Sequence, residues 1–146
     1  MKPAMSEGPS GVEILLVDDE SEILGEMAQW LSDSELPCAT AVSGAEALEV
    51  LRMHPEIRLV VTDVRMPGMD GYQLVEAARL LHEPLPSRRF IMVTGHLTAS
   101  DHARIGSFGV EGLLSKPIDL EELETMIRNA LGASEREPEP GAKTGQ

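Results

Sequence analysis

Residues 58–81 read RLVVTDVRMPGMDGYQLVEAARLL, and this stretch decides the fold. The run 58–62 is almost continuously apolar, which is typical of a short strand buried on both faces of a sheet. It ends in Asp63, and the Pro and Gly residues that follow predict a tight turn. A helix is indicated over 72–81, because its apolar residues recur at helical spacing: Leu74, Ala78 and Leu81. A buried strand that leads through a turn into an amphipathic helix is the repeating unit of an α/β protein.

The same unit recurs on both sides of this stretch. Strands are predicted over 12–17, 38–42, 90–94 and 112–115. Helices are predicted over 21–32, from the capping box Ser43–Glu46 to His54, over 100–108, and over 120–131 with Gly132 ending the last one. Five strand–helix units in alternation predict a doubly wound, five-stranded parallel sheet in a three-layer α/β/α sandwich.

Length and composition narrow the class of protein. We expect one domain at 12–131 in the 146 residues, between a flexible lead over 1–11 and a disordered acidic tail over 132–146. The net charge is −13, and such an acidic surface repels the phosphates of nucleic acids. We find no signal-like start and no apolar run that could span a membrane, so we expect a cytoplasmic protein with no membrane partner. A single cysteine, Cys38, excludes an internal disulfide.

Polar side chains follow four of the predicted strands. Asp18 and Asp19 follow the first strand, Asp63 the third, Thr94 the fourth and Lys116 the fifth. Because the carboxyl ends of parallel strands meet at one edge of the sheet, we expect these side chains to converge there. Clustered carboxylates repel one another unless a cation intervenes, and Mg²⁺ prefers oxygen ligands, including those of phosphate. A carboxylate nucleophile beside a metal, a hydroxyl and an ammonium predicts phosphoryl transfer to Asp63.

At these residues the chain resembles the receiver domains of bacterial two-component response regulators. The resemblance covers about 12–131 and rests on Asp18-Asp19, the run DVRMPGMDG over 63–71, Thr94-Gly95 and Lys116-Pro117, in the family's order and intervals. It implies a flavodoxin-like (CheY-like) fold. It also implies a phosphoacceptor with weak self-catalysis, not an enzyme that turns over small molecules.

The resemblance further implies a role for each matching residue. Asp63 would be the phosphorylation site, and Mg²⁺ would be held by Asp18, Asp19, Asp63 and the backbone carbonyl of Arg65. Thr94 would move toward the phosphoryl group, and Lys116, joined to Pro117 by a cis peptide, would bind it. The donor would be a phosphohistidine on a sensor histidine kinase or a histidine phosphotransfer protein. The signal would reach an unidentified downstream protein through the face formed by residues 94–131.

One position departs from the family's pattern. Receivers usually carry Tyr or Phe shortly before the site lysine, and here the aligned residue is Leu113. The expected switch surface therefore comprises Thr94, Gly95, His96 and Leu113. Our hypothesis is that the output relies on movement of the segment 95–109 without rotation of an aromatic side chain.

Two other interpretations stay open at this point. A flavodoxin-like fold also suits a nucleotide or FMN binder, although Asp18-Asp19-Glu20 after the first strand would repel phosphate unless a metal were bound. A degenerate receiver that never accepts phosphate would act as a constitutive interaction domain, and Leu113 is compatible with that role.

Overall fold

Strands and helices alternate along the whole described part of the chain. The computed structural model describes residues 11–81 and 88–135, and within them the predicted alternation is confirmed. The strands are β1 (Ile14–Val17), β2 (Cys38–Ala41), β3 (Leu59–Asp63), β4 (Arg89–Thr94) and β5 (Gly112–Ser115). The helices are α1 (Ser21–Asp33), α2 (Gly44–Met53), α3 (Gly71–Arg79), α4 (Ala99–Phe108) and α5 (Leu120–Glu135).

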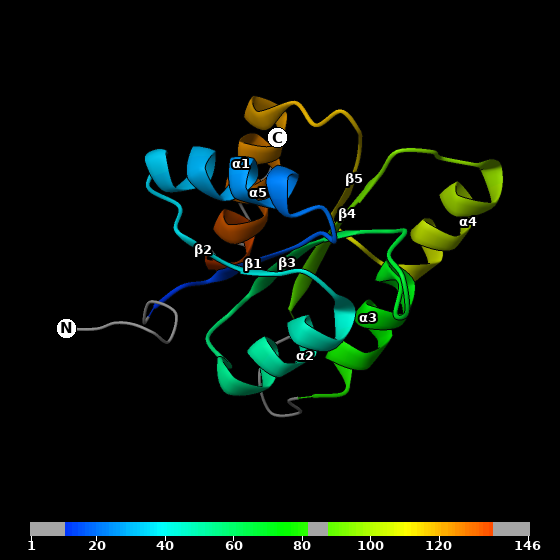
Figure 1. The fold of residues 1–146 in the computed structure, drawn as a ribbon, viewed down its shortest axis with the longest axis horizontal. Helices are drawn as coiled ribbons and strands as arrows, with labels where there is room; N and C mark the ends of the chain where they lie inside the picture. Colours follow the sequence, from blue (N-terminus) through cyan, green and yellow to red (C-terminus); the bar gives the residue numbers. More distant parts are fainter. Residues whose placement is uncertain (1–10, 82–87, 136–146) are drawn as a thin grey trace, which may run out of the picture.

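The strands form one parallel sheet in the order β2-β1-β3-β4-β5. Leu16 of β1 pairs with Thr40 of β2 on one side and with Val61 of β3 on the other. Figure 1 shows α1 and α5 on one face of the sheet and α2, α3 and α4 toward the other. The chain first winds outward to β2 and then reverses through β3, so the topological switch point lies between β1 and β3. This is the doubly wound sandwich that the sequence predicts.

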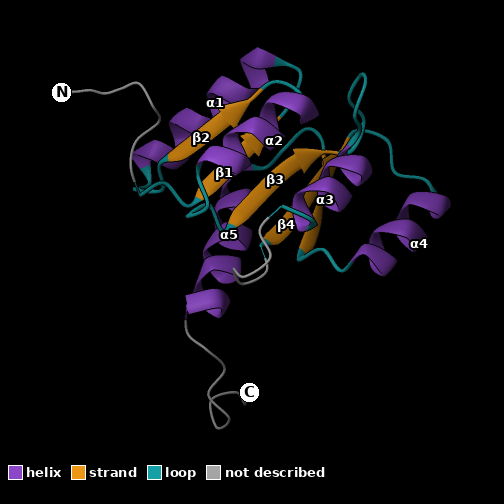
Figure 2. Cartoon of the chain, turned by 90° about the horizontal axis from the view of Figure 1, so that it is seen from below, coloured by secondary structure: helices purple, strands orange, loops and turns teal. Residues whose placement is uncertain are grey.

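Each face of the sheet has its own hydrophobic core. Figure 2 shows the strands between the helices that cover them. All residues of β1 and β3 are buried, because both strands lie inside the sheet with helices on both faces. Beneath α1 and α5 the buried side chains include Ile14, Leu16, Val61, Leu31, Leu123 and Ile127. On the opposite face they include Leu15, Val60, Leu51, Tyr72, Leu74 and Phe90. The helix face predicted from the periodicity of Leu74, Ala78 and Leu81 thus packs on the sheet.

Side-chain caps fix where four helices begin, and one of them is Asp119 before α5, which accepts from the backbone N–H groups of Glu121 and Glu122. Asp70 and Thr98 form reciprocal capping boxes at the starts of α3 and α4. Ser43 caps α2 by accepting from the backbone N–H of Glu46 at 3.1 Å. The predicted box at Ser43 is only half correct, because the Glu46 carboxylate accepts from the N–H of Val42 at 2.8 Å instead of that of Ser43.

The last helix is longer than its sequence suggests. The prediction that Gly132 ends it is wrong, since α5 continues to Glu135 and residues 132–135 are helical instead of part of a tail. Gly132 does not adopt the positive φ of a helix-ending glycine. A glycine inside a helix costs only about 1 kcal/mol relative to alanine, which a helix anchored on a core tolerates. Residues 1–10 of the predicted lead over 1–11, and residues 136–146 of the predicted tail, lie outside the described residues.

Polar contacts join α1 to α5 at the surface. The indole N–H of Trp30 and the hydroxyl of Ser34 both donate to the same carboxylate oxygen of Glu124, each at 3.1 Å. Arg128 donates to Glu124 at 3.0 Å and to the backbone carbonyl of Ser34 at 2.7 Å. Trp30 is therefore a surface packing residue, as its place in the sequence suggests.

Within residues 11–81 and 88–135, we find no helix with the length and apolar character needed to cross a bilayer.

Candidate functional site

The sheet brings the predicted acidic residues and the lysine together at the carboxyl ends of its strands. The Lys116 ammonium lies 2.9 Å from an Asp63 carboxylate oxygen and 3.2 Å from one of Asp18. It also lies 3.4 Å from the Glu20 carboxylate, a contact that sequence reasoning did not foresee. We call Asp18, Asp19, Asp63 and Lys116 the rim cluster. Two of its acids follow β1 and Asp63 is the last residue of β3, so the cluster occupies the topological switch point.

The three aspartates of the rim cluster form a set of hard oxygen donors. Asp18, Asp19 and Asp63 each offer a carboxylate oxygen, and these oxygens all lie within 4.8 Å of one another. Asp18 and Asp63 are buried, with 1% and 5% of their surface exposed, whereas Asp19 is open to solvent. A charge-dense group of carboxylates with one solvent-facing member suits Mg²⁺, which prefers oxygen ligands and usually keeps several waters. The donor set therefore fits the expected metal.

Burial and charge act in opposite directions on the two central groups of the rim cluster. Burial raises the pKa of the Asp63 carboxyl above its usual range, against the hydrogen bond and positive charge of Lys116. Burial would lower the pKa of Lys116, but the Asp63 and Asp18 carboxylates outweigh it and hold that pKa above its usual range. Lys116 therefore stays charged at neutral pH and is the resting counter-ion of the buried acids.

The backbone around Asp63 is packed tightly enough to fix the direction of its carboxylate. The backbone N–H of Arg65 donates to that carboxylate. The first residue of α3 is Gly71, and a Cβ built there would lie 2.4 Å from the Asp63 carbonyl oxygen. Only glycine lets α3 begin this close to the end of β3. The turn after Asp63 thus aims its side chain by backbone packing, in agreement with the structural role expected of the Pro and Gly residues there.

Thr94 and the residues after it form the part of the rim beside β4 and β5. The Thr94 hydroxyl is fully buried, accepts from the N–H of His96 at 3.2 Å and lies 3.3 Å from the His96 carbonyl. Gly95 and His96 are exposed, and the peptide between Lys116 and Pro117 is cis, as the resemblance implies. Thr94 is therefore placed at the predicted edge, but its hydroxyl bonds to the neighbouring turn in this state.

Leu113 occupies the position at which the resemblance to receiver domains would place an aromatic residue. It lies in β5, pairs in register with Met92 of β4, and packs half-buried against the core beneath α2 and α3. No hydroxyl is available there to bond to the Thr94 turn.

A second polar cluster, which sequence reasoning missed, joins Arg65 to α4. The Arg65 guanidinium lies 2.5 Å from one Asp101 carboxylate oxygen, and the Tyr72 hydroxyl donates to the other at 2.7 Å. The hydrogen bond from Tyr72, with those from Thr98 and the charge of Arg65, holds the pKa of Asp101 below its usual range despite burial. Burial and the Asp101 carboxylate raise the pKa of Tyr72 to about 12. No local motif signals the contacts of Asp101 with Arg65 and Tyr72, because both partners are distant from Asp101 in sequence.

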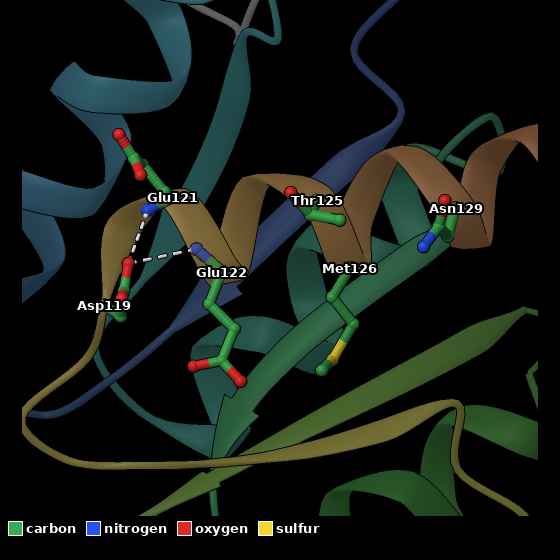
Figure 3. Close-up of a pocket in the computed structure, with 6 residues that line it drawn as sticks. All are labelled: Asp119, Glu121, Glu122, Thr125, Met126 and Asn129. Carbon is green, nitrogen blue, oxygen red and sulfur yellow. Dashed lines mark hydrogen bonds between the residues drawn. The ribbon is translucent and has the colours of Figure 1, made fainter.

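A shallow groove along α5 lies apart from the rim cluster (Figure 3). Asp119, at its start, accepts from the backbone N–H groups of Glu121 and Glu122 at 3.0 and 3.1 Å. The groove is lined by Asp119, Glu121, Glu122, Thr125, Met126 and Asn129. It shares no residue with the rim cluster.

Comparison with known proteins gives a consistent match. Residues 14–128 match the family model described as response regulator receiver domain. The DNA-binding transcriptional regulator NtrC of Escherichia coli (strain K12) is 31% identical over 128 residues, which cover 87% of this chain and 26% of the relative. The sensor histidine kinase RcsC of Salmonella typhi is 37% identical over 114 residues, which cover 78% of this chain and 12% of the relative.

A solved structure agrees over its whole length. The response regulator receiver domain protein (CheY-like) from Methanospirillum hungatei JF-1 has a TM-score of 0.79 at 28% identity, and the match covers 88% of this chain and 100% of that one. By contrast, the chain spans only 26% of the length of NtrC and 12% of the length of RcsC.

Proposed function

Because the chain belongs to the response regulator receiver domain family, we propose that its rim cluster accepts a phosphoryl group on Asp63 and passes the signal on through protein contacts. The observation that carries this assignment is the pairing of Lys116 with both Asp63 and Asp18, at 2.9 and 3.2 Å, beside the aspartate oxygens. The arrangement leaves one buried carboxylate that can act as nucleophile between a fixed positive charge and a set of metal-binding oxygens.

The proposed reaction transfers a phosphoryl group from a phosphohistidine to Asp63. A carboxylate oxygen of Asp63 forms the new P–O bond, the P–N bond of the donor breaks, and the leaving imidazole takes up a proton from water. The backbone N–H of Arg65 and the Lys116 ammonium orient the carboxylate, since both hydrogen-bond to it. In the product, Lys116 would pair with a phosphoryl oxygen, and the Thr94 hydroxyl would leave the His96 turn to donate to another.

Asp18, Asp19, Asp63 and the Arg65 carbonyl would hold Mg²⁺. When bound, the cation supplies positive charge that offsets the charge of the phosphoryl oxygens.

The proposed partners follow from the same chemistry. The donor would be a sensor histidine kinase or a histidine phosphotransfer protein, and the downstream partner would bind the face formed by residues 94–131. A cytoplasmic location and the absence of nucleic-acid and membrane contacts belong to the same proposal. A nucleotide or FMN site is disfavoured, because the buried Asp18 carboxylate and the exposed Asp19 follow β1, where such sites bind phosphate.

The test is phosphorylation by acetyl phosphate with Mg²⁺, followed by intact-mass measurement. We expect a gain of one phosphoryl group in the native protein and in Asp33→Asn, whose carboxylate is exposed on α1. The gain should vanish in Asp63→Asn and when EDTA replaces the metal. A native protein that never gains the group would instead be a non-phosphorylated interaction domain.

A further inference from the structure

An ion pair links the turn after Asp63 to the first half of α4. Arg65 lies two residues after Asp63, and its guanidinium contacts a carboxylate oxygen of Asp101 at 2.5 Å. The two side chains differ strongly in exposure, at 53% for Arg65 and 7% for Asp101. The carboxylate is therefore fixed within the protein, while the guanidinium reaches it from the solvent side and can leave without disturbing the core.

Asp101 depends on this link because it is a buried charge. Its second oxygen accepts from the Tyr72 hydroxyl at 2.7 Å, and Thr98 donates to its first oxygen through both backbone N–H and hydroxyl, at 3.2 and 3.0 Å. Tyr72 and Thr98 are neutral, so Arg65 supplies the positive charge in direct contact with the carboxylate. Removing the charged partner of a buried carboxylate is strongly unfavourable.

The helix that carries Asp101 has few other attachments. Asp101 and Ile105 are the two buried residues of α4, whereas α3 has five buried residues. In both Figure 1 and Figure 2, α4 stands at the outer edge of the molecule. Its remaining contacts include Phe108 against Tyr72, with ring centroids 5.3 Å apart, and a bond from Arg79 to the Phe108 carbonyl at 2.6 Å. The Arg104 guanidinium also lies over the Tyr72 ring, 3.8 Å from its centroid. With two buried residues, α4 depends on these polar and ring contacts in addition to its small apolar face.

A phosphoryl group on Asp63 would compete with Asp101 for the same guanidinium. It carries about −1.5 to −2 charges at neutral pH and presents three acceptor oxygens. The planar fork of arginine binds phosphate oxygens in pairs, and Arg65 already lies beside the Asp63 carboxylate through its backbone N–H. Leu113 carries no aromatic ring, and the contact of Arg65 with Asp101 is a connection from the turn after Asp63 to α4 that needs none.

We propose that Arg65 couples the phosphorylation state of Asp63 to the position of α4 by binding Asp101 at rest and the phosphoryl group after transfer. This inference rests on the proposed function, since it needs phosphorylation at Asp63. Arg65 is a positioning residue for α4, and Tyr72 and Asp101 are its resting partners. Transfer of the guanidinium leaves the Asp101 carboxylate without its charged partner, and α4 is released from α3.

The experiment measures hydrogen–deuterium exchange of the α4 amides in the full chain, before and after phosphorylation by acetyl phosphate with Mg²⁺. The α1 amides serve as an internal reference. In the native protein, phosphorylation should speed exchange in α4 by about tenfold to a hundredfold, the range expected for loss of one charge-assisted hydrogen bond. Arg65→Met should show this faster exchange already at rest and no further difference from the native protein once both are phosphorylated. Arg65→Lys should restore part of the resting protection.

A second variant keeps the metal and phosphoryl ligands intact. Tyr72→Phe removes only the hydroxyl that donates to Asp101, so this variant should gain the phosphoryl group normally. At rest, its α4 exchange should be faster than in the native protein, but by less than in Arg65→Met. After phosphorylation it should match the native protein, because α4 has then already been released from α3. Equal effects of a substitution in both phosphorylation states would mean that the network is merely structural, and would overturn the inference. So would a native protein that gains phosphoryl mass without any change in α4. Absence of the mass gain would overturn the proposed function, and the coupling with it.

Discussion

Replacing Lys116 with methionine tests the electrostatics of the rim cluster directly. The substitution removes the ammonium but keeps an apolar side chain, and it leaves Asp63 and Asp18 without their shared counter-ion. The lysine lies 2.9 and 3.2 Å from these carboxylates, and only 19% of its side chain is exposed. At an effective dielectric constant of about 20, opposite unit charges about 3 Å apart attract each other by about 5.5 kcal/mol. Measured losses on removing one partner of a buried pair are about 3–5 kcal/mol.

We therefore expect Lys116→Met to lower the free energy of unfolding by about 3–5 kcal/mol when EDTA removes divalent cations. Mg²⁺ should narrow this difference, because in the variant the metal no longer competes with an ammonium for the aspartate oxygens. A ligand at about 100 times its Kd stabilises a folded protein by about 2.7 kcal/mol, and the variant should gain more than the native chain. Urea unfolding followed by circular dichroism, with EDTA and with Mg²⁺, gives all four values.

Two further variants make the measurement specific. Arg52→Met removes an equally short ion pair, to Glu49 at 2.8 Å, but both side chains are more than half exposed, so the loss should stay below about 1 kcal/mol. Adding Asp18→Asn to Lys116→Met should recover part of the stability, since it removes one of the unpaired charges. A loss below about 1 kcal/mol for Lys116→Met in EDTA, or a difference that Mg²⁺ leaves unchanged, would refute the reasoning.

Three further predictions concern packing, ionisation and capping. Gly71→Ala should lower the free energy of unfolding by about 1–3 kcal/mol and slow phosphorylation, because the added Cβ would press on the Asp63 carbonyl. Gly25→Ala is the control: a Cβ there has nothing within 4 Å, so the substitution should stabilise α1 by about 1 kcal/mol. Equal effects of the two substitutions in urea unfolding would contradict this prediction. Burial raises the pKa of Cys38 to about 12, so its contribution to stability is complete below about pH 8.5 and is lost as the pH rises toward 12. The native protein should therefore lose stability more steeply between about pH 8.5 and pH 11 than Cys38→Ala, and parallel pH profiles would disprove it. Ser43→Ala should cost about 1 kcal/mol through loss of the α2 cap, and an unchanged thermal midpoint would show that the cap contributes nothing.

The elements and the rim cluster could be predicted because their signals are local. A continuous apolar run such as Leu59-Val60-Val61 marks a buried strand without any knowledge of its neighbours. Parallel strands then deliver their terminal residues to one edge, so Asp18, Asp63 and Lys116 could be placed together before any distance was known. The order of the strands in the structure adds the information about which of these residues are adjacent along that edge.

The contacts that could not be predicted depend on three-dimensional packing. Arg65 and Asp101 are 36 residues apart and Tyr72 and Asp101 are 29 apart, and arginine, tyrosine and aspartate are ordinary residues at helix ends. The reach of Glu46 to Val42, in place of Ser43, depends on how the chain enters α2. Gly132 does not end α5, because the chain does not adopt the left-handed conformation there, and the sequence alone does not show which conformation a glycine adopts.

The position of Trp30 decides what its fluorescence can report. It is the single tryptophan of the chain, 36% exposed, and its indole bonds to Glu124 on the face of the sheet opposite α4. The emission of Trp30 should change when α1 separates from α5. It should stay unchanged when a rearrangement is confined to α4. An optical probe for that helix therefore requires a second fluorophore, for instance Phe108→Trp in a Trp30→Phe background.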